Sequence, residues 1–324
     1  MHLPAKYVRA LVFLTTFFAW QHFNLEAIED GDKCQKDGSI DSSDSKKEED
    51  KKDQEEKKDD EPLKIGFLAF PTSQQPGPLI AFGQNFVDKG QLQAILVGSY
   101  IKGHKQYAAI INPTFVYGVT DTFSLFFAAP DAVKLRQGED HSSGIQDLLL
   151  QVEYGFYTKN KKDSSDEASV VANVTFPTGS TKKSPPTGDG QCSCFLGFTY
   201  NRMTFDWYYF ASTGGIWNGS NQGTRFGSQF LYQGGIGRMI VSSDDWYLSW
   251  LIEGSGTLAD RNRIDGKTDH NSGGNVIYVT PSLTFATIKR FFIQGGIQVP
   301  LYQHLFGKQT RNDVGAAVNI GWVF

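Results

Sequence analysis

Hydrophobic and polar residues alternate along most of the chain after residue 90. In the segment that ends the sequence, VGAAVNIGWVF (314–324), apolar residues occupy every second position, and small or polar residues stand between them. Alternate side chains of a β-strand point to opposite faces, so this segment predicts a strand with one apolar face. A strand of a soluble β-sandwich shows the same alternation, and the segment alone does not separate the two classes.

The same alternation recurs in further segments and predicts twelve strands in all. It is clear in QYAAIINPTFVY (106–117), IQDLLLQVEYGFY (145–157), ASVVANVTF (168–176) and DWYLSWLIEG (245–254). Arg238 falls on the apolar side of RFGSQFLYQGGIGRMI (225–240) and fits less well. An even number of antiparallel strands returns both ends of the chain to the same side, as in bacterial outer-membrane barrels.

The expected connections differ in length on the two sides of such a barrel. Those on the inner side, near residues 119, 162, 202, 243 and 288, are tight except for TKNKKDSSDE near 162. Those on the outer side, at 130–144, 178–191, 218–224, 259–273 and 302–311, are longer, and only the one near 104 is short. This asymmetry favours a bacterial outer-membrane protein, all-β, with residues 91–324 forming a single antiparallel transmembrane β-barrel in contact with lipid.

Aromatic residues gather at the predicted inner ends of the strands, where a girdle would meet the lipid headgroups. They are Tyr117, Phe123, Tyr200, Phe205, Trp246, Phe285, Phe291, Trp322 and Phe324. Lipid cannot satisfy free backbone groups, so we expect the last strand to pair with the first and close the sheet.

The region before the barrel divides into three segments. Lys6 and Arg9 precede the apolar run at 10–20, which predicts a secretory signal peptide at 1–27, with a retained anchoring helix as the alternative. Residues 28–62 form a charged linker that we expect to be disordered, because residues 41–62 alone hold 11 acidic and 6 basic residues. Residues 63–90 either plug the lumen or pack beneath the barrel in the periplasm, and the sequence does not choose between these.

Composition removes several other classes of function. The formal net charge is −4, and without the acidic run the rest of the chain is nearly neutral, so we expect no nucleic-acid partner. The chain has 3 cysteines, too few for a disulfide scaffold, and Cys192 and Cys194 lack the neighbouring ligands of a zinc site. We expect neither a cofactor nor a metal.

The inward-facing polar positions are the candidate transport residues. They are Asp147, Glu153, Asn173, Asp206, Glu253, Gln294 and Gln298, interleaved with the inward aromatics Phe195, Tyr208, Phe210 and Phe292. Polar groups mixed with aromatic rings suit the passage of a small amphipathic solute better than free ion flow. The alternative is that these side chains only fill the lumen of a structural barrel.

Enzyme function has little support. His141 and Ser142 are adjacent in a predicted outer loop, where a rim hydrolase could place its site. A catalytic Ser/His pair also needs an orienting acid and an oxyanion donor at defined geometry, and adjacency in sequence supplies neither. We therefore expect no catalytic residue.

Three stretches of the sequence resemble a known family. YGVTDTFSLFFAAPDAV, SGIQDLLLQVEYGFY and FPTGS follow one another as in the phenol meta-pathway (MetA-like) outer-membrane transporters, although Ile145-Gln146-Asp147 departs from the Gly-Asp that the family favours there. The resemblance spans about residues 90–324 and implies uptake of small, aromatic solutes. The terminal GWVF is similar to the signal read by the barrel-assembly machinery, which assigns Ile320, Trp322 and Phe324 to assembly. A channel is thus the leading hypothesis, and a structural or surface-interaction barrel with a filled lumen is the alternative.

Overall fold

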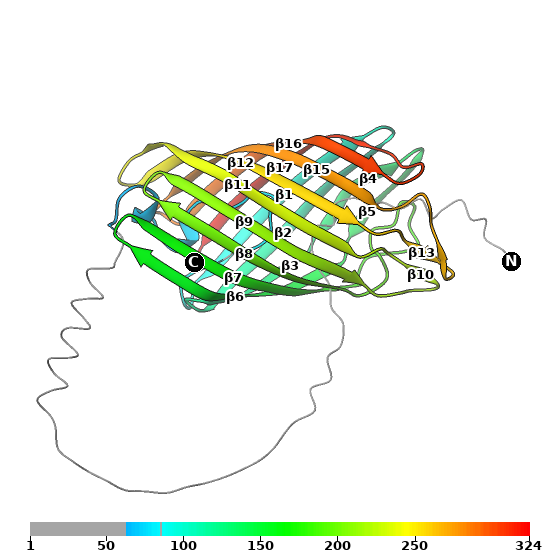
Figure 1. Ribbon diagram of the computed structural model, residues 1–324, viewed down its shortest axis with the longest axis horizontal. Helices are drawn as coiled ribbons and strands as arrows, with labels where there is room; N and C mark the ends of the chain where they lie inside the picture. Colours follow the sequence, from blue (N-terminus) through cyan, green and yellow to red (C-terminus); the bar gives the residue numbers. More distant parts are fainter. Residues whose placement is uncertain (1–62, 85) are drawn as a thin grey trace, which may run out of the picture.

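The structure is a computed structural model that describes residues 63–84 and 86–324. The predicted signal peptide and charged linker lie outside the described residues. The prediction of a closed antiparallel barrel of twelve strands is confirmed (Figure 1). Its strands are β1 (Leu92–Gly103), β2 (Gln106–Thr120), β3 (Phe123–Ala128), β6 (Leu148–Lys161), β7 (Ser164–Phe176), β8 (Ser193–Thr204), β9 (Trp207–Asn218), β11 (Gln229–Ser242), β12 (Trp246–Ala259), β15 (Gly274–Thr287), β16 (Phe291–Leu305) and β17 (Asn312–Val323). Within the described part of the chain, no helix is long and apolar enough to cross a membrane.

The barrel closes between its first and last strands. β17 pairs antiparallel with β1 from Val323 opposite Gln93 to Asn312 opposite Gly103. At the very end, the Phe324 N–H donates to the Leu92 carbonyl at 2.8 Å. The closing strand predicted from the terminal alternation is therefore confirmed, and its pairing removes the free edge that lipid could not satisfy.

Two predicted connections were wrong. Residues 130–144 are not an irregular outer loop, because β4 (Asp131–Gln137) and β5 (Asp140–Ile145) continue the ladder above β3 and β6 to a tight turn at Gly138. The stretch near 162 is also tight, since β6 and β7 stay paired to Lys161 opposite Ser164. Both strand extensions carry polar side chains and therefore lack the alternation that predicts a strand. A strand outside the membrane does not contact lipid and needs no apolar face. The outer loops also hold a small sheet of β10 (Thr224–Arg225), β13 (Arg263–Ile264) and β14 (Lys267–Thr268).

The outer face of the barrel is apolar and ends in aromatics. On β17 and the residue after it, Ile320, Trp322 and Phe324 are 39%, 49% and 63% exposed, and Trp322 contacts Phe291 with ring centroids 5.4 Å apart. Phe205 is an exception to the predicted girdle, because it packs against a cluster of buried residues that includes Phe67.

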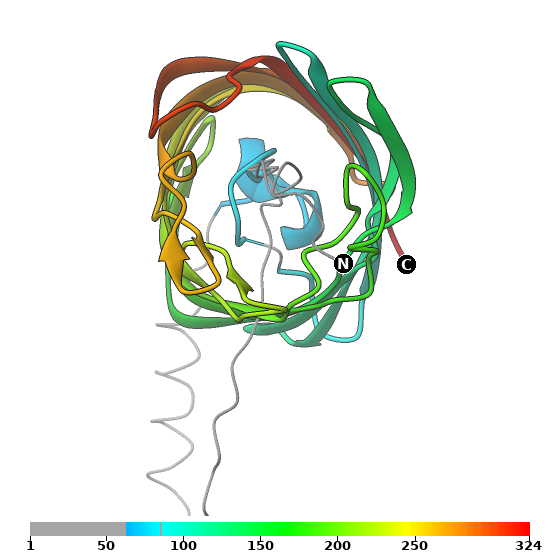
Figure 2. The same ribbon diagram turned by 90° about the vertical axis from the view of Figure 1, so that its right-hand side faces the viewer.

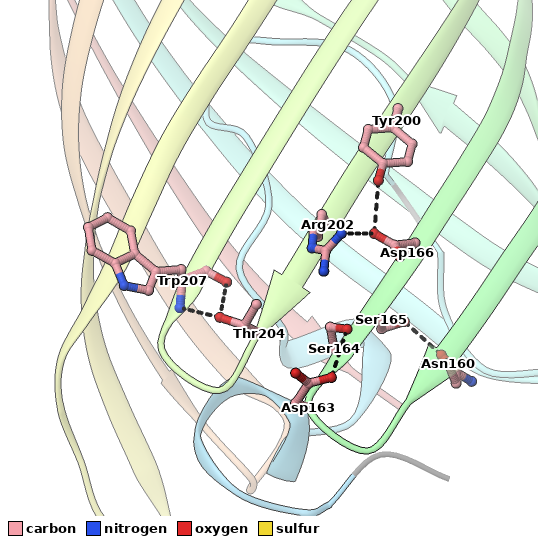
Figure 3. Close-up of polar contacts among 9 residues, drawn as sticks. All are labelled: Asn160, Asp163, Ser164, Ser165, Asp166, Tyr200, Arg202, Thr204 and Trp207. Carbon is pink, nitrogen blue, oxygen red and sulfur yellow. Dashed lines mark hydrogen bonds and ion pairs between the residues drawn. The ribbon is translucent and has the colours of Figure 1, made fainter. Parts of the chain in front are cut away.

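Two arginines on the outer face, Arg202 and Arg238, lie at its inner end and are each paired with an aspartate. Figure 3 shows Tyr200 and Arg202 of β8 beside Asp166 of β7. The Tyr200 hydroxyl donates to Asp166 at 2.8 Å, and an Arg202 nitrogen lies 3.6 Å from the same carboxylate. Arg238, which broke the apolar pattern of β11, has its guanidinium 5.0 Å from the centre of the Trp207 ring. Such side chains fit the membrane interface, where aromatic rings and charges meet headgroups and water.

The segment that precedes β1 lies inside the barrel. Figure 2 looks in from the outer-loop end and shows this segment, in blue, in the middle of the ring of strands. It enters at the inner end, where the Leu63 N–H donates to the Lys162 carbonyl at 3.0 Å, and forms the short helices η1 (Gly66–Ala69) and η2 (Thr72–Gln74). Residues 63–84 and 86–91 are called the plug below. The plug supplies Phe67, Phe70 and Phe82 to the buried clusters that fill the lumen around it.

Candidate functional site in the barrel lumen

The candidate site is the place where the plug crosses the lumen between residues 77 and 84. Glu253 of β12 projects inward and is 1% exposed. Its two carboxylate oxygens accept three consecutive backbone N–H groups, from Leu79 at 2.6 Å, Ile80 at 3.1 Å and Ala81 at 3.2 Å. A buried carboxylate is costly unless it is hydrogen-bonded, and bonds from backbone N–H groups to a charged acceptor are among the strong ones. Glu253 is therefore the central anchor of the plug.

A second carboxylate fixes the far end of the same loop. Glu153 of β6, also 1% exposed, accepts the Gln84 N–H at 2.7 Å and the Ser169 hydroxyl at 2.6 Å. Ser169 in turn shares a hydrogen bond of 2.7 Å with Thr199. The parity of the strands forces both glutamates inward, because a carboxylate facing hydrocarbon at this depth is strongly unfavourable.

Neutral side chains complete the attachment. Gln233 of β11 accepts the Phe82 N–H at 3.1 Å, and Ser212 of β9 donates to the Phe82 carbonyl at 3.3 Å. Gln294 of β16 donates to the Gly77 carbonyl at 3.0 Å. The plug loop is thus bound by side chains of five strands, including the two that carry Glu153 and Glu253, and it adds no strand to the barrel ladder.

Aromatic rings of the plug occupy aromatic sites of the wall. Phe67 and Phe70 each contact Tyr247 edge to face, with ring centroids 5.2 Å and 4.8 Å apart. Phe82 contacts Phe195 in the same way at 4.6 Å. Such geometry adds about 0.5–1.5 kcal/mol per pair beyond the buried area. The lumen therefore offers at least two sites that already hold a phenyl ring.

The other predicted transport residues do not all join this site. Asn173 donates to Gln151 on the wall at 3.3 Å, and Gln298 projects inward and is 5% exposed; neither bonds to the plug in the described structure. Asp147 instead ties the outer loop at 177–192, accepting the N–H groups of Gly179 and Asp189 at 2.8 Å each. Burial raises the pKa of Asp147, and burial together with the Asp147 charge raises the pKa of Asp189 to about 7.

Asp206 does not line the lumen, which corrects the prediction from parity. It lies in the turn between β8 and β9, where its carboxylate lies 3.2 Å from Nε of Arg238. Strand alternation does not continue through a turn, so parity could not place this side chain. The adjacent pair His141 and Ser142 belongs to β5, and the Ser142 hydroxyl donates to the Pro185 carbonyl at 2.6 Å, which ties one outer loop to another.

Sequence reasoning missed the plug-binding role of several groups. Tyr247 is fully buried and donates to the Gln74 carbonyl at 2.8 Å. Its position between Trp246 and Leu248 on the inward parity was the available signal, since a tyrosine on that side needs a partner for its hydroxyl. Among the described residues, no group of three or more His, Cys, Asp or Glu is placed to hold a metal ion.

Comparison with known proteins agrees with this architecture. A family model described as "Putative MetA-pathway of phenol degradation" matches residues 129–302. The COG4313 outer membrane channel from Pseudomonas putida F1 aligns with a TM-score of 0.63 and 16% identity, over 77% of this chain and 99% of that chain. The NanC porin aligns with a TM-score of 0.43 and 12% identity, over 71% of this chain and 98% of that one. At 16% identity the likeness to the COG4313 channel shows the fold alone, a β-barrel, and the family match agrees with a location in the outer membrane. No curated protein matches the sequence significantly.

Proposed function

We propose that this chain, which belongs to the MetA-pathway family, is a gated outer-membrane channel for passive uptake of small aromatic solutes. In this proposal the plug is the gate. In the structure the plug crosses the lumen, and in this proposal solute passes when residues 77–84 release from the wall and withdraw toward the inner end.

One observation carries the proposal: the plug is held at mid-lumen by side chains that bind its backbone. Glu153, Gln233, Glu253 and Gln294 hold it by hydrogen bonds to its N–H and carbonyl groups. Such bonds can exchange for water one by one, because water replaces both partners. A segment that formed a strand of the barrel could not move without breaking the sheet. The plug is not part of the sheet, so it can move while the barrel wall stays closed.

The aromatic contacts of the plug support the choice of solute. Phe82 against Phe195 and Phe67 against Tyr247 show that the wall accepts phenyl rings. When the plug withdraws, these wall positions become free for a solute of the same shape. The phenol pathway for which the family is named agrees with a phenyl-bearing solute.

A structural barrel is the alternative function, and the packed lumen favours it. Plug and wall residues share two continuous apolar clusters, one around Phe82 and one around Phe67. If the plug never leaves, these clusters are simply the core of the protein, and the outer loops carry its function.

Solute flux into proteoliposomes separates the two functions. We would compare two uncharged sugars that lipid excludes, phenyl β-glucoside and methyl β-glucoside, with the full chain reconstituted. The proposal expects the phenyl compound to enter faster although it is larger, because it can use the aromatic sites. Faster entry of the methyl compound would indicate a simple sieve, and no entry of either would favour the structural barrel.

Three further assignments are part of the proposal and rest on the sequence. Residues 1–27 direct export, and residues 28–62 form a charged spacer ahead of the plug. Ile320, Trp322 and Phe324 serve recognition by the barrel-assembly machinery. Their outward position at the end of the closing strand supports this role, because the signal must be accessible before the barrel closes.

A further inference from the structure

Basic side chains gather on the outer face of the barrel at its outer end. Lys102 of β1, Tyr107 of β2, Arg136 of β4 and His141 of β5 are neighbours in one row of the sheet. Lys134 lies in the row below, with its ammonium 5.5 Å from the centre of the Tyr107 ring. β4 and β5 lie at the same end of the barrel as β10 and β13 (Figure 1).

These side chains point away from the lumen. The alternate residues on the same strands, Ile101, Ala108 and Leu135, form a buried cluster on the inner face. Side chains of a strand alternate between faces, so Lys102, Tyr107 and Arg136 lie on the outer face.

Lys102 and Arg136 of this row and Lys134 below it, together called the basic row, are not paired with acidic side chains in the described structure. Among the described residues, Lys102, Lys134 and Arg136 form no ion pair, in contrast to Arg202 and Arg238 at the inner end. The Arg136 Nε donates to the Gly138 carbonyl, which leaves the rest of its guanidinium available. Nearby Asp140 accepts the Ser184 hydroxyl at 2.7 Å. Three unpaired cations on one face attract a ligand with more than one negative charge.

An apolar hollow lies directly next to this basic row. It has a volume of about 1000 Å³ and is lined by outward residues such as Tyr100, Ile111, Val133, Leu283 and Ile297. Its floor is low because small residues lie on all three neighbouring strands: Gly98 of β1 and Gly295 of β16 flank Val318 of β17, and Ala316 lies two residues along β17. Ala109, which pairs with Lys134 in the sheet, also lines the hollow, so the basic side chains adjoin the edge of the hollow.

We propose that the basic row and the hollow together form a binding site for one phosphorylated glycolipid of the outer leaflet. Lys102, Lys134 and Arg136 bind its phosphates, and the hollow takes its acyl chains. The position decides the occupant, because the outer end of the barrel faces the leaflet that is built from phosphate-bearing glycolipid. This site is separate from the lumen and does not depend on the channel function.

Native mass spectrometry of the full chain in detergent tests the site. The probes are bisphosphorylated lipid A, monophosphorylated lipid A and phosphatidylglycerol. Each basic group near a lipid surface contributes measurably, so K102Q/K134Q/R136Q should weaken binding of bisphosphorylated lipid A by roughly tenfold or more. The matched control R225Q/R263Q/K267Q removes the same charge from exposed loop strands of the same end and should stay within about twofold of the wild type.

A second variant tests the hollow. A Cβ atom added at Gly98 would lie 3.9 Å from the Val318 carbonyl oxygen, an ordinary contact, so Gly98→Leu should fold and place its side chain in the hollow. It should weaken lipid A binding while leaving the preference for two phosphates over one. Wild-type binding by K102Q/K134Q/R136Q, or equal binding of phosphatidylglycerol, would overturn the glycolipid site. Unchanged binding by Gly98→Leu would overturn the role of the hollow.

Discussion

Replacing Glu253 by glutamine removes the charge of the plug's anchor and keeps its shape. The glutamate offers oxygens to three N–H groups, whereas glutamine offers one oxygen and turns an amide donor toward the rest. At least one bond to a charged acceptor is lost, worth about 1.5–3 kcal/mol, and the others weaken. Relief of the buried charge offsets part of this loss. We expect a net shift of about 2–4 kcal/mol toward the released plug, a change of about 30- to 700-fold in its population.

Single-channel recording in planar bilayers measures this population directly. If the closed plug blocks the lumen, Glu253→Gln should open more often and for longer than the wild type. Ser255→Ala is the matched control, because Ser255 lies on the same face of β12, two residues away, and makes no hydrogen bond to the plug in the described structure. It should behave as the wild type.

The reasoning fails if Glu253→Gln folds normally and its currents match those of the wild type. Folding is checked by the shift in gel migration between heated and unheated samples. Equal currents in a folded variant would show that the carboxylate does not control the plug, or that the plug does not control the lumen.

Three further predictions concern other parts of the molecule. Phe324→Asp should lower the amount of barrel in the outer membrane, measured by blotting of membrane fractions, because a charge replaces a ring at the lipid interface; normal levels would contradict its role in assembly. The outer loop at 177–192 should be cleaved faster by protease at about pH 8 than at about pH 5. Its ordered form favours protonated Asp189, whose pKa is raised to about 7, so the stabilisation of the ordered loop is lost as pH rises through that value. Asp189→Asn should abolish the difference in cleavage rate, and a pH-independent rate in the wild type would refute the prediction. Phe82→Ala should open the plug without changing Glu153 or Glu253. The open state should then prefer cations, measured as reversal potentials at low salt. An open state without ion preference would show that the two glutamates do not line the conducting path.

The strands were predictable because the membrane imposes a rule on every one of them. Lipid requires an apolar outer face, so alternation revealed all twelve strands and the orientation of Glu153 and Glu253. The requirement for an apolar outer face holds only for the part of each strand that contacts lipid. It therefore failed for Asp206 in a turn and for β4 and β5 above the membrane. Arg238, which broke the pattern, marks the inner interface instead.

The partners of the two glutamates were not predictable in the same way, because they are backbone N–H groups. Every residue except proline carries a backbone N–H group, so no type of side chain in the sequence indicates which N–H groups will bind a carboxylate. The contact between Glu253 and Leu79 also joins positions that are 174 residues apart in sequence. Strand alternation therefore placed both glutamates on the lumen side without naming a partner, and in the structure their partners are N–H groups of the plug.

The plug loop nevertheless has a local signal that a backbone-binding site would need. In PGPLIAFGQ (76–84) the two prolines lack N–H groups, so the first three donors after Pro78 are the ones that Glu253 binds. Gly83 has a φ of +85°, and a Cβ atom there would overlap the Thr199 side chain, so only glycine fits. Gly83→Ala should therefore displace the loop from the wall and open the channel as Glu253→Gln does, although it replaces no side chain of the barrel wall. Wild-type currents from a folded Gly83→Ala barrel would show that the loop can shift without opening the lumen, and the gate would then have to lie elsewhere in the plug.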